Sequence, residues 1–240
     1  MNTIVTPEVG GLSAALRRVG VVPVVTVSRP EQAIPLAEAL RLGGLSCVEI
    51  TFRSDAAVAA IEMLRSQAPD MLVGAGTVLT IAQAEAAIAA GATFIVAPGF
   101  NPAVVEHVLR RGIPMLPGVC TPTEIEAALA RDIRIVKFFP AGAMGGVGFL
   151  RALAGPYPMV SYVPTGGVTT ENLADYLALS SVAAVGGTWL AKPNVVAAGD
   201  WKEVERLAAE AAAIVRRARG GDGGPVVVAT GDDAGSRRPA

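Results

Sequence analysis

A lysine lies inside one of the most apolar segments of the chain. Lys137 follows Val136 and precedes Phe138 and Phe139. Burial of an unpaired ammonium group is costly, so these surroundings favour the uncharged amine. An uncharged lysine amine attacks ketones to form a Schiff base, but a buried lysine is also a common half of a structural ion pair. By position alone, Lys137 fits both roles equally well.

A carboxylate occupies similar surroundings at Glu49, between Val48 and Ile50. If both segments are strands of one closed barrel, the alternation of side chains can point Glu49 inward, toward Lys137. Burial favours the protonated acid and a nearby cation favours the carboxylate, so the sequence leaves the net effect open. Glu49 could move protons during Schiff-base chemistry or simply neutralise Lys137, and the two roles are compatible.

Two more polar residues follow expected strands. Arg53 carries a forked donor that suits a substrate carboxylate, although a lone arginine in a loop is more often a solvated charge. Thr77 could donate its hydroxyl to the same carboxylate. Its alternative role is to cap the next helix, which Thr80 fills better.

Two diglycines, Gly166-Gly167 and Gly186-Gly187, follow the segments expected to form the last two strands. Barrels often bind phosphate there through backbone N–H groups, and glycine lets the backbone approach the anion closely. Thr188 could add a hydroxyl. Each pair alone is typical of a simple turn, but two at these positions predict a phosphate site.

Short apolar segments alternate with Ala- and Leu-rich segments of helical period. Eight such units, about 25 residues apart, predict an α/β fold, a (β/α)₈ TIM barrel with buried parallel strands. An open doubly wound sheet is the alternative, but the expected Gly-rich turn after its first strand is replaced by residues 26–30. The expected strands are 21–25, 47–50, 72–75, 94–97, 115–117, 133–138, 162–163 and 182–185. The expected helices are 31–42, 56–67, 81–90, 102–111, 122–130, 147–153, 173–179 and 201–217.

The chain ends differ from the barrel. A short amphipathic helix over 11–19 could cover the N-terminal end of the barrel. We expect one barrel domain over residues 1–219, followed by a disordered tail over 220–240, which is rich in Gly and Asp. A short strand over 225–228 is an alternative for part of that tail.

Composition excludes several classes of function. The net charge of −1 indicates neither a nucleic-acid nor a membrane partner held by bulk electrostatics. Cys47 and Cys120 form no CxxC unit, and the N-terminus lacks a secretory pattern, so a cytoplasmic location is expected. The one histidine, His107, lies toward the outer side of its expected helix, so a catalytic triad or a His-rich metal site is hard to build.

Eight motifs, in this order and spacing, resemble the 2-keto-3-deoxy-6-phosphogluconate (KDPG) and 4-hydroxy-2-oxoglutarate (KHG) aldolases, a family of class I aldolases. The resemblance covers about residues 12–217. The motifs are VEITFR (48–53), VGAGTV (73–78), PG (98–99), PGVCTPTE (117–124), VKFFPA (136–141), AGPYP (154–158), PTGGV (164–168) and VGGTWL (185–190).

The resemblance implies a homotrimer that acts on a phosphorylated keto acid without metal or other cofactor. It implies Lys137 as the Schiff-base lysine and Glu49 as the general acid and base. Binding roles would fall to Arg53 and Thr77 for the pyruvyl carboxylate, Phe139 and Pro98 for the pocket wall, Thr165 for the aldehyde-derived part, and Gly166, Gly167, Gly187 and Thr188 for the phosphate.

One departure is that serine is expected where Thr188 stands, and its extra methyl group crowds the phosphate end. The galactonate epimer, or unphosphorylated KHG, is therefore an alternative substrate. A trimeric scaffold or phosphate-binding protein without turnover is the alternative outside enzymes.

Overall fold

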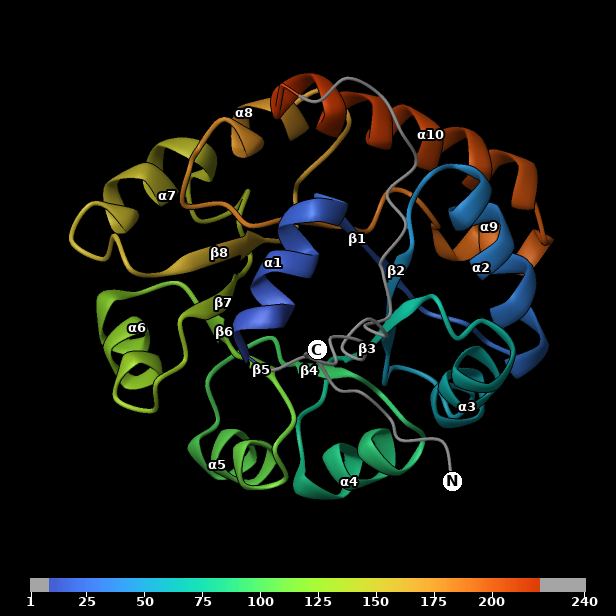
Figure 1. Ribbon diagram of the computed structural model, residues 1–240, viewed down its shortest axis with the longest axis horizontal. Coiled ribbons are helices and arrows are strands. Elements are labelled where there is room, and N and C mark those ends of the chain that lie inside the picture. The colour runs from blue at the N-terminus through green and yellow to red at the C-terminus, as the bar shows by residue number, and fades with distance from the viewer. Residues whose placement is uncertain (1–8, 221–240) are drawn as a thin grey trace, which may run out of the picture.

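The computed structural model describes residues 9–220, which form a closed barrel of parallel strands surrounded by helices (Figure 1). The strands are β1 (Val21–Val25), β2 (Cys47–Thr51), β3 (Leu72–Gly76), β4 (Phe94–Val96), β5 (Met115–Leu116), β6 (Gly118–Val119), β7 (Ile135–Phe138), β8 (Ser161–Pro164) and β9 (Val185–Gly187).

The barrel closes because β1 pairs with β2 on one side and with β9 on the other. The β8 segment in turn meets the β9 segment through two isolated parallel bridges, Tyr162–Val182 and Thr165–Gly186, each of which includes one residue just outside its strand. β5 and β6 flank Pro117, which has no N–H to donate, and together they fill the fifth strand position. The predicted TIM barrel is confirmed, and the open sheet is excluded.

All of the helices except α1 form the outer ring of Figure 1 and shield the strands from water. In chain order the helices are α1 (Val9–Val19), the 3₁₀ turn η1 (Pro30–Gln32), α2 (Ala33–Leu42), α3 (Ala57–Gln67), α4 (Ile81–Ala89), α5 (Pro102–Arg110), α6 (Pro122–Leu129), α7 (Gly146–Ala154), α8 (Leu173–Leu177), α9 (Pro193–Ala198) and α10 (Trp201–Ala218).

α1 lies across one end of the barrel rather than in the outer ring (Figure 1). Its Arg17 donates hydrogen bonds to Ser161 Oγ, at the start of β8, and to the carbonyl oxygen of Ser180, before β9. These contacts lie at the amino ends of the strands. The helix therefore covers the N-terminal end of the barrel, as predicted, and leaves the carboxyl ends for a site.

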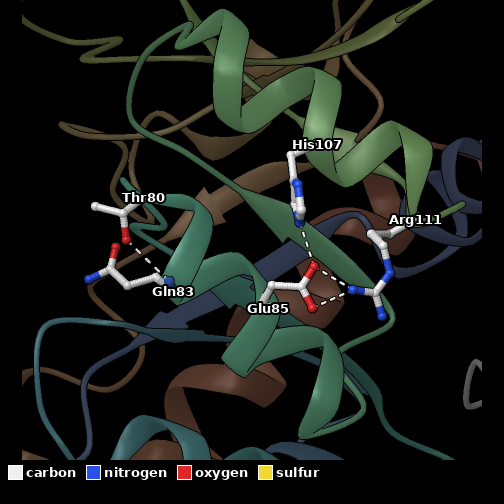
Figure 2. Close-up of polar contacts among 5 residues, drawn as sticks. All are labelled: Thr80, Gln83, Glu85, His107 and Arg111. Carbon is white, nitrogen blue, oxygen red and sulfur yellow. Dashed lines mark hydrogen bonds and ion pairs between the residues drawn. The ribbon is translucent and has the colours of Figure 1, made fainter.

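Helix starts agree with the capping pattern of the sequence. Asn101 and Thr121 each accept a hydrogen bond from the first turn of α5 and α6, and proline follows both caps. Thr80 caps α4 by accepting from the backbone N–H of Gln83 (Figure 2). This contact leaves Thr77 free of the capping role.

Two element predictions need correction. The last strand was expected over 182–185, but Val182 forms only an isolated bridge and β9 begins at Val185. Gly186 and Gly187 therefore lie inside the strand and not after it. α9 was not predicted, because six residues are too few to show a helical period. The predicted tail, and the short strand over 225–228, lie outside the described residues apart from Gly220.

No helix within residues 9–220 is long and apolar enough to cross a membrane.

Candidate active site

Lys137 lies on β7 and points into the barrel. The ring of the next residue, Phe138, stacks on Phe149 of α7 with centroids 5.9 Å apart, so Phe138 faces the outer helices. Neighbouring residues of a strand point to opposite faces, which sends Lys137 inward. Its Nζ donates to Glu49 Oε1 of β2 at 3.3 Å across the barrel interior. The predicted proximity of these two residues is confirmed.

Both members of this pair are almost entirely removed from water. Glu49 is 4% exposed and Lys137 is 5% exposed. Charges at this depth are tolerated when they are paired, because each compensates the desolvation of the other. Nζ also lies 5.6 Å from the ring centroid of Phe139, within the range of a cation–π contact.

Glycine on the neighbouring strand makes room for the Glu49 carboxylate. A Cβ built on Gly76, at the end of β3, would lie 2.0 Å from Glu49 Oε1. A side chain at position 76 would therefore force the Glu49 carboxylate to move. In the sequence, Gly76 stands out only as part of the motif VGAGTV. A glycine that ends a strand can mark the place of a buried acid on the neighbouring strand, but only when the register of the two strands is known.

Arg53 and Thr77 follow β2 and β3 and lie at one edge of the barrel. The turns that carry them are joined by a hydrogen bond of 2.7 Å from Phe52 N to the Gly76 carbonyl oxygen. Arg53 is exposed and Thr77 is half-buried. Thr77 adopts a left-handed φ of 58°, an unfavourable conformation for a β-branched residue. Such strain often accompanies a binding function.

The two diglycines lie on neighbouring strand ends, as a shared anion site requires. Gly166 and Gly167 follow β8 with left-handed φ values of 86° and 79°. Gly186, in β9, bridges to Thr165, and a Cβ on Gly186 would lie 2.1 Å from Thr165 Oγ1. Thr165 is buried, while Thr188 just beyond β9 is exposed.

Phe139 and Pro98 lie close to Lys137 or to its register partner on β6. A Cβ on Gly166 would lie 3.2 Å from the Phe139 ring, so this ring lies between the lysine and the first diglycine. Pro98 packs on β6, since a Cβ on Gly118 would lie 2.0 Å from the Pro98 carbonyl oxygen. Gly118 is the register partner of Lys137.

The predicted site residues differ in how the structure places them. Contacts join Lys137 to Glu49 and Phe139. Arg53, Thr77 and Thr188 are placed only by the ends of the strands that they follow.

His107 lies apart from this site, on the outer helix α5. Its Nε2 forms a hydrogen bond with Glu85 of α4, and Arg111 also donates to that carboxylate (Figure 2). Among residues 9–220, no group of three or more His, Cys, Asp or Glu side chains is arranged to hold a metal ion.

Known proteins are similar to this chain in sequence and in fold. Residues 12–207 match the family model "KDPG and KHG aldolase". A 2-dehydro-3-deoxy-phosphogluconate aldolase of Treponema pallidum is 51% identical over 201 residues, which are 84% of this chain and 96% of that protein. The enzyme of the same name from Haemophilus influenzae is 44% identical over 201 residues, 84% of this chain and 95% of its own.

A solved structure also carries chemical information. The KDPG aldolase of Legionella pneumophila superposes with a TM-score of 0.79 at 37% identity, over 82% of this chain and 96% of that one. It is described as holding pyruvate as a covalent carbinolamine intermediate. The family model spans most of the barrel, and both relatives match over nearly their full length. The chain therefore belongs to the KDPG and KHG aldolase family.

Proposed function

We propose that the protein is a class I aldolase that cleaves 2-dehydro-3-deoxy-6-phosphogluconate to pyruvate and glyceraldehyde 3-phosphate through a Schiff base on Lys137. The observation that carries this proposal is the buried contact of Lys137 Nζ with Glu49 Oε1, 3.3 Å apart at the centre of the barrel. The names of the relatives at 44–51% identity support the substrate.

The cycle begins with a nucleophilic attack. Lys137 passes a proton to Glu49 across their 3.3 Å contact. The resulting uncharged amine adds to the C2 ketone, a proton moves from nitrogen to the new C2 oxygen, and a carbinolamine forms. Glu49 delivers a proton to the C2 hydroxyl, which leaves as water and gives the iminium ion. The positive charge then lies near the Phe139 ring, where Lys137 Nζ is found, and that ring stabilises it.

The iminium next accepts an electron pair. Glu49, now a carboxylate, removes the proton of the C4 hydroxyl, the C3–C4 bond breaks, and its electrons form an enamine. Glyceraldehyde 3-phosphate leaves. Glu49 returns a proton to C3, and water hydrolyses the resulting imine to release pyruvate and the Lys137 amine. The lysine imine is the electron sink of this cycle, which uses no metal or other cofactor.

Binding divides between two ends of the site. Arg53 and Thr77 hold the pyruvyl carboxylate at the ends of β2 and β3, and Phe139 and Pro98 form the wall of the pyruvyl pocket. Thr165 lies beside the aldehyde-derived part. The phosphate binds at the neighbouring ends of β8 and β9, where Gly166, Gly167, Gly187 and the hydroxyl of Thr188 lie.

Borohydride reduction in the presence of pyruvate tests this mechanism. The reduced pyruvyl mass should map to Lys137 alone. The chain has only two other lysines, Lys192 and Lys202, and both are exposed, so they are internal controls in the same peptide map. Lys137→Ala should take up no label, and Lys192→Arg should take up as much as the unsubstituted protein. Label on the exposed lysines but not on Lys137 would reject the assignment.

The family description includes a second, unphosphorylated substrate, KHG. The two glycine pairs on adjacent strand ends favour a phosphorylated substrate over KHG. A pyruvate-release assay coupled to lactate dehydrogenase should give the highest kcat/KM with the phosphorylated gluconate, below it the galactonate epimer, and the lowest with KHG. No release from any of them would favour the scaffold alternative.

A homotrimer is the assembly proposed from the family resemblance. Light scattering on the purified full chain should give three times the chain mass of 24.4 kDa.

A further inference from the structure

Two threonine hydroxyls form a contact in the barrel that the proposed cycle does not use. Thr26 follows β1 and Thr51 ends β2, and their Oγ1 atoms are 2.7 Å apart. Thr51 is 1% exposed, whereas Thr26 is half-buried. Thr51 is thus enclosed, whereas Thr26 is partly accessible to solvent.

Both hydroxyls lie on the inner side of the barrel. Val24 and Glu49 are register partners on β1 and β2, and Glu49 reaches Lys137 across the interior. Thr51 is two residues beyond Glu49 on the same strand, so it shares the inward face. Thr26, two residues beyond Val24, joins it from β1. The pair therefore lies one step closer than Glu49 to the carboxyl ends of the strands.

The strand order places this pair between the two binding ends of the site. β9 with its glycines is next to β1, and β1 is next to β2, which leads to Arg53. A keto acid with its phosphate at β8 and β9 and its carboxylate at the ends of β2 and β3 has its middle carbons near β1. Two of those carbons, C4 and C5, carry the hydroxyls of the aldehyde-derived half.

The hydrogen-bonding capacity of the pair fits a hydroxyl. One threonine donates its only proton to the other, which leaves one donor and several lone pairs free. A substrate hydroxyl also donates one proton and accepts others. An anion would use only the donor, and a cation only the lone pairs.

We propose that Thr26, held in orientation by Thr51, binds the C5 hydroxyl of the substrate and makes the enzyme select aldehydes that carry a hydroxyl beside the carbonyl carbon. This assignment rests on the proposed aldolase function. It makes Thr26 a specificity-determining residue and Thr51 a positioning residue.

The test compares two aldehydes in the direction of synthesis, with pyruvate as the partner. Glyceraldehyde 3-phosphate has the hydroxyl, and 3-oxopropyl phosphate lacks it. Thr26→Val, which keeps the branched shape, should lower kcat/KM about tenfold for the first aldehyde and leave the second nearly unaffected, since only the first loses a hydrogen bond. Thr26→Ser should restore most of the preference, and Thr51→Val should reduce it by a smaller factor.

Rates are divided by the concentration of sites that borohydride traps with pyruvate, so a partly folded variant still gives a valid ratio. Thr93→Val is the matched control, because Thr93 is a buried threonine that bonds the Val73 carbonyl at the amino end of β4. Its aldehyde ratio should equal that of the unsubstituted protein. An unchanged ratio in Thr26→Val, with pyruvate still trapped, overturns the Thr26 assignment alone. Absence of any pyruvate adduct in the unsubstituted protein overturns the assignment and the aldolase proposal together.

Discussion

Gly76 and Glu49 occupy neighbouring strands so closely that the space a Cβ of residue 76 would need is taken by the Glu49 carboxylate. The obstructing atoms belong to the side chain that holds Lys137, and so a change at Gly76 must move the acid of the proposed cycle. A position without a side chain therefore controls the geometry of the ion pair.

Gly76→Ala should lower kcat strongly and lower stability only slightly. Its Cβ would displace the Glu49 carboxylate, and loss of a positioned acid and base typically costs about 100- to 10,000-fold in rate. The measurement is kcat for pyruvate release, together with the thermal unfolding midpoint. Gly148→Ala is the control, because a Cβ there meets nothing within 4 Å and the residue lies within α7. Equal rates in Gly76→Ala and the unsubstituted protein would show that Glu49 has room to move.

The roles of Glu49 and Lys137 are separable by experiment. Glu49→Gln keeps the size of the side chain but removes its ability to exchange protons, so cleavage should slow about 100-fold or more. Slow trapping of pyruvate at Lys137 should persist, since the amine remains. Lys137→Ala should abolish both.

Glu210→Gln serves as the control for this pair, since Glu210 is an exposed acid on the outer helix α10 and its loss should leave the rate unchanged. If Glu49→Gln cleaved substrate at the normal rate, Glu49 would have only the neutralising role.

Strain at Thr77 gives a third prediction. A left-handed φ costs a non-glycine residue about 1–2 kcal/mol, and glycine relieves it but adds chain entropy of roughly 0.5–1 kcal/mol. Thr77→Gly should therefore raise the free energy of unfolding by about 0–1.5 kcal/mol. It should also raise KM for pyruvate in synthesis, because the hydroxyl is lost.

Asp132→Gly is matched to this substitution, since Asp132 has a φ of 56° in an exposed turn after α6. Its unfolding free energy should change in the same way, with KM unchanged. A normal KM in Thr77→Gly would remove Thr77 from the carboxylate site.

The contact between Lys137 and Glu49 could be predicted from the sequence because it depends on the residues that flank each of them. Lys137 and Glu49 each interrupt an apolar strand, and buried charges of opposite sign need each other. In a barrel whose strands alternate inward and outward side chains, few arrangements both bury these two charges and pair them. The position of the first diglycine, after β8, was predicted in the same way from the order of strands around the barrel, whereas the second diglycine lies inside β9 and not after it.

Other features depend on the stagger between strands, which the local pattern does not contain. The contact of Gly76 with Glu49 and that of Thr26 with Thr51 both require the register of neighbouring strands. The start of β9 was misplaced for the same reason. Residues 182–185 are uniformly apolar, so nothing in their sequence marks where pairing with β1 begins.

The Glu85 cluster on the outer helices predicts a pH effect on stability that is independent of catalysis (Figure 2). Hydrogen bonds from Arg111 and then His107 lower the pKa of the Glu85 carboxyl. A carboxyl whose pKa is lower in the folded state stabilises the fold above its unfolded pKa, about 4.3, and that contribution is lost as the pH falls through the folded pKa. Glu85→Gln should therefore have a lower thermal midpoint than the unsubstituted protein at pH 7. The difference should shrink steadily below about pH 4.3.

Glu62→Gln, at an exposed acid on α3, controls for the loss of one charge and should show little difference at any pH. Thermal unfolding of the three proteins between pH 7 and pH 3 measures these differences. A Glu85→Gln difference that stayed constant, or widened in acid, would mean that the carboxylate contacts do not stabilise the fold. Since His107 lies on α5 and Arg111 directly follows its last residue, the same data report how firmly α4 and α5 are joined at the outside of the barrel.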